Sequence, residues 1–247
     1  MARSMTQAYS AGERISAGAD DKREQAPDWR RTLAELASRI PEPERVSPAW
    51  RVAECLIASL GLLLTWPLML LVALIVRLDS PGPVLFRHWR VGQGGRLFRF
   101  TKFRTFHADA RHRFPHLYAY NYSPKEIEEL QFKIPGDPRV TRAGEWLRRS
   151  TLDELPNLWH VLTGEMSLVG PRPEIPEMLP YYREDRLIKF SVRPGITGLA
   201  QISGRGRLRF RETEQLDAEY VRGRSLRLDL SILARTISLM LRQDGAF

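Results

Sequence analysis

One uncharged apolar segment constrains this chain more than any other feature of its sequence. From Cys55 to Val76 there is no Asp, Glu, Lys or Arg, over about 22 positions, which is enough for a helix to cross a bilayer. No second segment of this kind occurs in the 247 residues. The segment begins too far from the N-terminus, and is too long, for a cleaved signal peptide. We therefore predict a protein that associates with a membrane.

A proline interrupts this apolar segment near its middle. Pro67 removes one backbone donor and crowds the preceding turn, and the Thr65 hydroxyl lies close enough to bond a freed carbonyl. Basic residues precede the segment at Arg39, Arg45 and Arg51 and follow it at Arg77, Arg87, Arg90, Arg96 and Arg99. Because cytoplasmic flanks carry Lys and Arg, two basic flanks predict that both ends stay on the cytoplasmic side. A re-entrant helix broken at Pro67 meets both conditions, and a kinked single-pass helix remains the alternative.

The charge of the chain calls for an anionic partner. With 38 basic and 29 acidic residues the net charge is +9, which suits nucleic acid, a phospholipid surface or a phosphorylated substrate. The segment from Pro81 to Arg113 contains eight basic residues and one acidic residue, Asp109. Next to a membrane helix, this strip favours lipid headgroups or a phosphorylated ligand over nucleic acid. A single cysteine, Cys55, excludes a disulfide scaffold and a cysteine-cluster zinc site.

The remaining pattern predicts an α+β fold, mostly helical, in one folded domain over residues 81–247 that follows the membrane helix of residues 48–80. Residues 1–47 are polar and predict a flexible tail, although the apolar spacing from Trp29 to Ile40 also fits one short amphipathic helix. Segments 84–91 and 96–105 flank Gly92–Gly95 and predict a β-hairpin. Further helices are expected at residues 121–134, 145–149, 181–191, 211–221 and 228–241. The last of these is amphipathic, either a core helix or an interfacial one.

The densest cluster of reactive side chains is Arg148-Arg149-Ser150-Thr151-Leu152-Asp153-Glu154-Leu155-Pro156. Thr151 and Glu154 have the spacing of a capping box, a purely structural use. Pro156 instead favours a helix that begins at Asp153, because its missing N–H is harmless in a first turn. The helix dipole and the two arginines would then lower the pKa of Asp153 and keep it an anion. Such a carboxylate can act as a nucleophile on phosphorus, and Glu154 could bind Mg²⁺.

At this point the chain resembles a known family. The matching motifs occur in family order from about Trp50 to the C-terminus, and they are Asp79–Phe86, Lys102–Thr105, Asp137–Thr141, Leu147–Arg149, Leu152–Pro156, Gly164–Pro173, Arg193–Gln201 and Asp244–Phe247. This set resembles the bacterial sugar transferases, the monotopic polyprenol-phosphate phosphoglycosyl transferases, in their short form. Three positions depart from the family pattern: Trp66 before the proline, Glu54 for an aspartate, and His88 for a glutamine.

The resemblance implies an activity and a set of site residues. Family members transfer a sugar-1-phosphate from a UDP-sugar to undecaprenyl phosphate, which releases UMP. By resemblance, Asp153 attacks the β-phosphorus to form a covalent phosphosugar intermediate, and Glu154 binds Mg²⁺. The family's basic phosphate-side positions fall on Lys102, Arg104, Arg148, Arg172 and Arg205. Asp217 matches a family acid, for which a metal- or phosphate-side role and a structural ion pair both remain open. The family's membrane element is a re-entrant helix broken at a proline, which corresponds to Pro67 with Thr65 beside it.

The resemblance also implies where the protein works and with what. It places the catalytic domain on the cytoplasmic face of the bacterial inner membrane, among phospholipids, at the first membrane step of exopolysaccharide, capsule, O-antigen or glycoprotein glycan assembly. No nucleic acid is expected as a partner, and the oligomeric state is left open, a homo-oligomer included. The alternative is a catalytically silent membrane scaffold of a polysaccharide assembly system, which would not need an intact Asp153-Glu154 pair. The sugar itself cannot be deduced.

Overall fold

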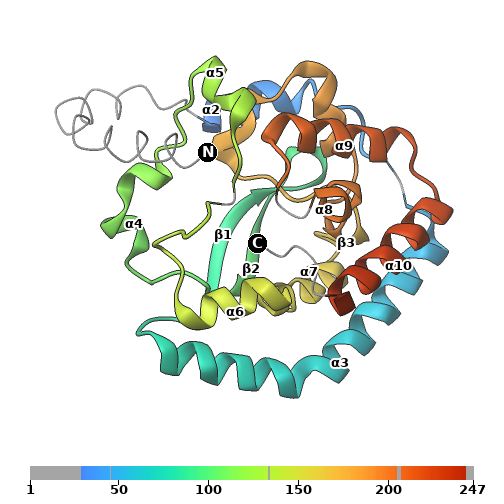
Figure 1. Cartoon of the computed structure of the whole chain (residues 1–247). Coiled ribbons are helices and arrows are strands. Elements are labelled where there is room, and N and C mark those ends of the chain that lie inside the picture. Colours follow the sequence, from blue (N-terminus) through green and yellow to red (C-terminus); the bar gives the residue numbers. More distant parts are fainter. Residues whose placement is uncertain (1–28, 45, 133, 205–206, 243–247) are drawn as a thin grey trace.

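Helices form most of the structure, a computed structural model that describes residues 29–44, 46–132, 134–204 and 207–242 (Figure 1). Its α-helices are α2 (Trp29–Ala37), α3 (Pro48–Asp79), α4 (Ala110–Arg113), α5 (Pro124–Glu129), α6 (Arg142–Ser150), α7 (Asn157–Thr163), α8 (Leu199–Gly204), α9 (Phe210–Arg222) and α10 (Leu226–Arg242). Its strands are β1 (Leu85–Val91), β2 (Leu97–Phe103), β3 (Ser167–Val169) and β4 (Gly195–Thr197). The predicted α+β, mostly helical organisation is confirmed.

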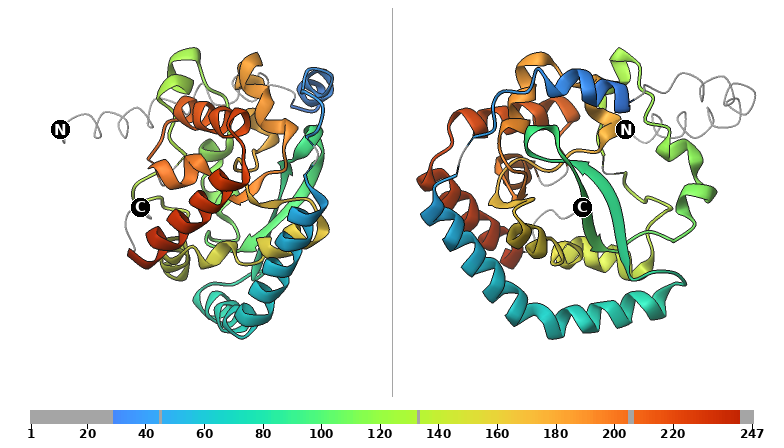
Figure 2. Two further views of the ribbon diagram at one scale, coloured as in Figure 1. Left: turned by 90° about the vertical axis from the view of Figure 1, so that its right-hand side faces the viewer. Right: turned by 180° about the vertical axis from the view of Figure 1, so that it is seen from behind.

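Helix α3 contains the whole apolar segment and passes around one side of the molecule. It is continuous over 32 residues, with Pro67 inside it, and it bends near its middle (Figures 1 and 2). The Thr65 hydroxyl donates to the Gly61 carbonyl at 2.7 Å, as expected beside a proline break. Most of its apolar side chains are exposed, and it alone among the described helices is long and apolar enough to cross a membrane. A bent helix with an outward apolar surface has the shape that a re-entrant element requires.

Buried polar contacts attach the N-terminal half of α3 to the domain. The Glu54 carboxylate is fully buried, and it accepts hydrogen bonds from the Leu168 N–H at 3.0 Å and from the Ser167 hydroxyl. Arg51, one turn earlier, donates to the Val161 carbonyl at the end of α7. Because a buried carboxylate must be paired, Glu54 fixes the rotation of α3 about its axis. The glutamate that departs from the family pattern therefore anchors the helix.

The predicted β-hairpin is confirmed. Strands β1 and β2 pair antiparallel, and Gly94, at φ +63°, takes the left-handed conformation that the tight turn needs. The register sets Phe86 opposite Lys102, His88 opposite Phe100 and Arg90 opposite Phe98. Because facing residues of a pair share one side of a sheet, these six side chains lie on one face, which we call the site face of the hairpin.

The N-terminal region contains the helix that was one of the two alternatives for residues 29–40. Leu33 and Leu36 of helix α2, with Ile40 just after it, pack against a cluster that includes Val91 of the hairpin and Leu187. The Gln93 side chain at the hairpin turn donates to the Glu44 carbonyl at 2.9 Å. This part of the predicted tail is thus packed on the hairpin turn, while residues 1–28 lie outside the described structure.

Two short parallel strands position the segment that follows them. Strands β3 and β4 meet through glycines: a Cβ atom on Gly195 would lie 2.0 Å from the Gly170 nitrogen, and one on Gly198 would lie 2.2 Å from the Gly170 oxygen. Only glycine permits these backbone approaches. The Gly195 N–H also donates to the Pro171 carbonyl at 2.9 Å. This close packing fixes the chain immediately before Arg172, which reaches the candidate site.

Candidate active site

Asp153 and Glu154 lie on a single 3₁₀ turn, Leu152–Glu154, between α6 and α7. The prediction of a helix beginning at Asp153 is therefore wrong, because α7 begins only at Asn157, after Pro156. The capping-box alternative is also wrong. Thr151 ends α6 in the left-handed conformation, at φ +57°, and its hydroxyl donates to the Ser150 carbonyl and accepts no capping hydrogen bond from a helix N–H. The sharp reversal at Thr151 turns both acids toward the hairpin.

The Asp153 carboxylate is buried and has one close cation. Only 5% of the residue is exposed, and Oδ2 lies 3.3 Å from the Lys102 ammonium of the hairpin's site face. Burial raises the pKa of Asp153, and the opposing attraction of Lys102 is too weak to reverse the shift. The expected lowering of this pKa by a helix dipole and two arginines is thus wrong. The dipole is missing because no helix begins at Asp153.

The Glu154 carboxylate is held by an arginine. Its Oε1 accepts a hydrogen bond from Arg172 at 2.6 Å. Burial would raise the pKa of Glu154, but the charge and hydrogen bond of Arg172 outweigh it and lower the value. The two carboxylates of the dyad therefore differ: the Glu154 carboxylate is a stable anion, whereas the Asp153 carboxylate is the more basic of the two.

The two arginines at the end of α6 lie on different sides of the helix. Arg148 lies 4.0 Å from Asp137 and stacks over the Phe106 ring at 5.5 Å, on the side of the helix that faces Asp153. Arg149 pairs instead with Glu145 on the exposed side of the same helix. A helix turns by about 100° per residue, so two adjacent arginines cannot serve the same site. Arg148 remains a phosphate-side candidate.

Two of the predicted residues have other partners in the described structure, and a third lies outside it. Arg104 is buried, and it donates to the carbonyls of Pro81 at 2.6 Å and Ser80 at 2.8 Å, just beyond the C-terminus of α3. These carbonyls bind its two terminal nitrogens and give Arg104 a structural role, and its role as a phosphate ligand stays a prediction. Asp217 of α9 is buried against Lys189 at 2.9 Å, which is the structural ion pair that the sequence left open. Arg205 lies outside the described residues.

Sequence reasoning did not single out Arg90, which the structure adds to the site. This arginine lies on the site face of β1, donates to the Pro173 carbonyl at 3.2 Å and stacks over Phe100 at 5.5 Å. Its charge acts on both Glu154 and Arg172. The signal was present, because counting back from Lys102 through the hairpin turn puts residue 90 on the same face. Lys102, Arg90, Arg172 and Arg148 thus surround two carboxylates, an excess of positive charge suited to a diphosphate.

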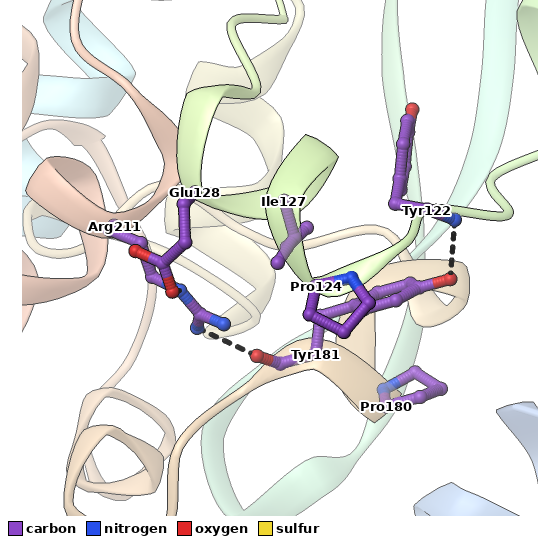
Figure 3. Close-up of a pocket in the computed structure, with 7 residues that line it drawn as sticks. All are labelled: Tyr122, Pro124, Ile127, Glu128, Pro180, Tyr181 and Arg211. Atoms are coloured by element: carbon purple, nitrogen blue, oxygen red, sulfur yellow. Dashed lines mark hydrogen bonds and ion pairs between the residues drawn. The ribbon is translucent and has the colours of Figure 1, made fainter.

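Two cavities of the described residues are lined by other residues. One, of about 230 Å³, lies beside α5 and is lined by Tyr122, Pro124, Ile127, Glu128, Pro180, Tyr181 and Arg211 (Figure 3). Its polar groups bond one another, for example Arg211 to the Tyr181 carbonyl at 2.8 Å and the Tyr181 hydroxyl to the Tyr122 N–H at 2.9 Å. None of the predicted site residues lines it. The candidate site is marked by its charged side chains.

The fold and the acidic pair define the class of protein, and the chain belongs to the bacterial sugar transferase family, whose model matches residues 46–243. Among its relatives, the UDP-glucose:undecaprenyl-phosphate glucose-1-phosphate transferase of Caulobacter vibrioides is 40% identical over 205 residues, which cover 80% of this chain and 71% of the relative. The exopolysaccharide production protein ExoY of Rhizobium meliloti is 37% identical, over 81% of this chain and 88% of the relative.

Other relatives are much longer than the matched region. The undecaprenyl-phosphate galactose phosphotransferase of Salmonella typhimurium is 38% identical over 75% of this chain, and the match spans only 39% of that protein. An uncharacterised sugar transferase of Haemophilus influenzae is 36% identical over 87% of this chain and 44% of its own length. The chain thus spans less than half the length of several relatives.

Proposed function

We propose that this protein transfers a sugar-1-phosphate from a UDP-sugar to undecaprenyl phosphate and releases UMP. The observation that carries the proposal is the buried Asp153 carboxylate among Lys102, Arg172 and Arg148, within a family whose relatives include undecaprenyl-phosphate glucose and galactose phosphotransferases. The basic side chains would neutralise the donor diphosphate, which reduces the repulsion that an attacking carboxylate meets. The same charges would receive the lipid phosphate.

The reaction would proceed in two displacements at one phosphorus atom. In the first, a carboxylate oxygen of Asp153 attacks the β-phosphorus of the donor, and the bond from that phosphorus to the bridging oxygen breaks, so UMP leaves. In the second, a phosphate oxygen of undecaprenyl phosphate attacks the same phosphorus, and the Asp153 carboxylate is released. A raised pKa makes Asp153 more basic and hence a better nucleophile once ionised. Lys102 would keep enough of it ionised near neutral pH.

The residues present fit a magnesium ion that the substrate helps to bind. The described residues contain no cluster of three side chains able to hold a metal. Mg²⁺, however, is often held by one or two carboxylates together with substrate phosphates, and Asp153 and Glu154 supply such a pair. Glu154, whose side chain is 19% exposed, is the better ligand of the two because it stays ionised. When bound, the ion would neutralise charge on the diphosphate.

Helix α3 would place this site at the membrane surface. Its outward apolar side chains would enter the bilayer from the cytoplasmic face, and the bend near Pro67 would return the chain to the same face. Exposed Leu226, Leu230 and Ile237 of α10 would add an interfacial contact. Single cysteines at Ser47 and Leu78, in a Cys55→Ser background, should both resist an impermeant reagent applied from the periplasmic side. Labelling of one end alone would contradict the re-entrant path.

The decisive experiment measures UMP. Membranes that contain the protein are incubated with undecaprenyl phosphate, Mg²⁺ and a panel of UDP-sugars, and we expect UMP from one sugar or a few. Asp153→Asn should release none, whereas Asp109→Asn, an exposed acid paired with Arg113, should match the wild type. Acid-quenched protein, incubated with donor alone, should carry a sugar-phosphate mass on the peptide that contains Asp153. No UMP from any UDP-sugar would refute the proposal and leave the silent scaffold as the better account, whereas undiminished UMP release by Asp153→Asn would refute Asp153 as the nucleophile.

A further inference from the structure

A pair of aromatic rings on the hairpin has no part in the displacement steps. The rings of Phe86 and His88 on β1 are nearly parallel, with centroids 6.0 Å apart and an angle of 14° between planes. Phe86 is 39% exposed, which is unusual for a phenylalanine on the face of a sheet that also points into a charged site. Both side chains belong to the site face that carries Lys102 and Arg90.

The position of the Phe86–His88 pair on the hairpin relates it to the sugar of the donor. Phe86 is the direct cross-strand neighbour of Lys102, and such neighbours have Cβ atoms about 5 Å apart. The Lys102 ammonium in turn lies 3.3 Å from the Asp153 carboxylate. Phe86 is therefore the cross-strand neighbour of the lysine that pairs with the carboxylate proposed to attack the β-phosphorus. The group bonded to that phosphorus is the sugar, whereas the uridine lies on the far side of the diphosphate.

The surroundings of the pair are polar, which argues against a lipid contact. Charged groups act on His88 from three elements: Arg90 on its own strand, Arg111 of α4 and Glu177 of the 3₁₀ helix Pro176–Tyr181. Burying these charges in hydrocarbon would be costly. An aromatic ring bordered by charged and hydrogen-bonding side chains is instead suited to a ligand with one apolar ring face and polar edges. A pyranose has this character.

The His88 ring offers a defined hydrogen-bonding atom. Its Nδ1 lies 2.9 Å from the Trp89 carbonyl oxygen, and because a carbonyl only accepts, Nδ1 carries the proton. Burial and the Arg90 charge lower the pKa of His88, so the ring is neutral at pH 7. Its Nε2 is then an acceptor, the complement of a sugar hydroxyl.

We propose that Phe86 stacks on the apolar face of the donor's sugar ring and that His88 supports Phe86 and accepts a hydrogen bond from a sugar hydroxyl. The pair would then determine which sugar is transferred. The inference rests on the proposed function, because it uses the donor that this function implies. His88 stands where the family usually has glutamine, so the sugar preference of this chain should depend on its ring.

The test compares donor binding with product binding. Calorimetry in the Asp153→Asn background, which cannot turn over, measures the affinity of UDP-glucose, UDP-galactose and UMP with Mg²⁺ present. Phe86→Leu should weaken binding of the preferred UDP-sugar by about 5- to 10-fold, the usual worth of one aromatic contact, and leave UMP within about 2-fold. His88→Gln should change the ratio of affinities for the two UDP-sugars. UMP serves as the reference because it contains the uridine and one phosphate but no sugar.

Trp89→Leu is the matched control. Trp89 is the neighbouring aromatic residue, 47% exposed, but it lies on the opposite face of β1 with Arg99 over its ring at 5.4 Å. Its loss should leave both affinities unchanged. Three results would overturn the inference: equal weakening of UMP, which would assign the ring to uracil; no weakening of either ligand; or the same loss in Trp89→Leu. A wild type that binds the UDP-sugar but releases no UMP would contradict the proposed function alone.

Discussion

Asp137 and Asp153 are both buried beside cations, yet their surroundings shift their pKa values in opposite directions. Asp137 accepts three side-chain hydrogen bonds from Arg139, at 2.9, 3.2 and 2.7 Å, and a fourth from the Arg139 N–H at 3.0 Å. Burial would raise its pKa, but these bonds outweigh burial and lower it. Asp153 has one contact, 3.3 Å from Lys102, and burial raises its pKa.

The difference separates a structural carboxylate from a reactive one. Asp137 fixes the chain that leads into α6, and a bidentate arginine saturates its oxygens. Asp153 keeps lone pairs that the protein does not use, at a cost in folding free energy. An under-paired anion in a positively charged site is what a nucleophile toward phosphate requires, whereas a saturated anion would be inert. Removing each charge should therefore have opposite consequences for activity and for stability.

The largest expected effect is on turnover. Asp153→Asn should lower UMP release by at least about 1000-fold, because an amide cannot replace the carboxylate nucleophile. Asp137→Asn should retain more than about a tenth of wild-type activity at a temperature where it is folded, since Asp137 does not touch the reacting atoms. Initial rates of UMP release at saturating donor give the comparison. Equal losses in the two variants would erase the distinction between the two aspartates.

The second effect is on stability, and it concerns Asp137. Asp137→Asn leaves the Arg139 guanidinium without its bidentate partner, so we expect a loss of about 2–3 kcal/mol in the free energy of unfolding. The partial exposure of Arg139 keeps the loss below that of a fully buried pair. Thermal unfolding in detergent should show a transition several degrees lower. Asp109→Asn, which removes an exposed ion pair with Arg113, should change the transition by less than one degree.

The third effect is on the pH dependence of the reaction. Asp153 must lose its proton to attack, so kcat/KM should rise with pH through the apparent pKa of the coupled dyad and then level off. Lys102 is the main force that lowers the pKa of Asp153. Lys102→Met should move this rise to higher pH by about one unit, and Lys102→Arg by less. A curve that does not move would show that Lys102 only binds substrate.

Much of the fold followed from local sequence patterns. The hairpin was predictable because glycines separate two β-rich segments, α3 because its uncharged apolar run is long enough to cross a bilayer, and α10 because its sequence is amphipathic. The environment of Asp153 was not predictable in the same way. Its burial results from the hairpin, α6 and the Pro171–Pro173 segment meeting in space, and from a left-handed Thr151 that ends α6. The structural partners of Arg104 could not be predicted for the same reason, because they are carbonyls more than twenty residues away.

The smallest expected effect is a gain in stability from removing the reactive charge. Because the pKa of Asp153 is higher in the folded than in the unfolded chain, ionisation costs folding free energy, and the cost appears as pH rises through the folded-state pKa. At pH 8, Asp153→Asn should therefore raise the free energy of unfolding by about 0.5–1 kcal/mol, and it should unfold at a higher temperature. Toward acid pH, as Asp153 becomes protonated in the folded state, the difference should shrink toward zero. Asp137→Asn should show the reverse trend, with its deficit greatest at pH 8. A variant Asp153→Asn that is less stable at every pH would mean that the Lys102 contact outweighs the cost of burial.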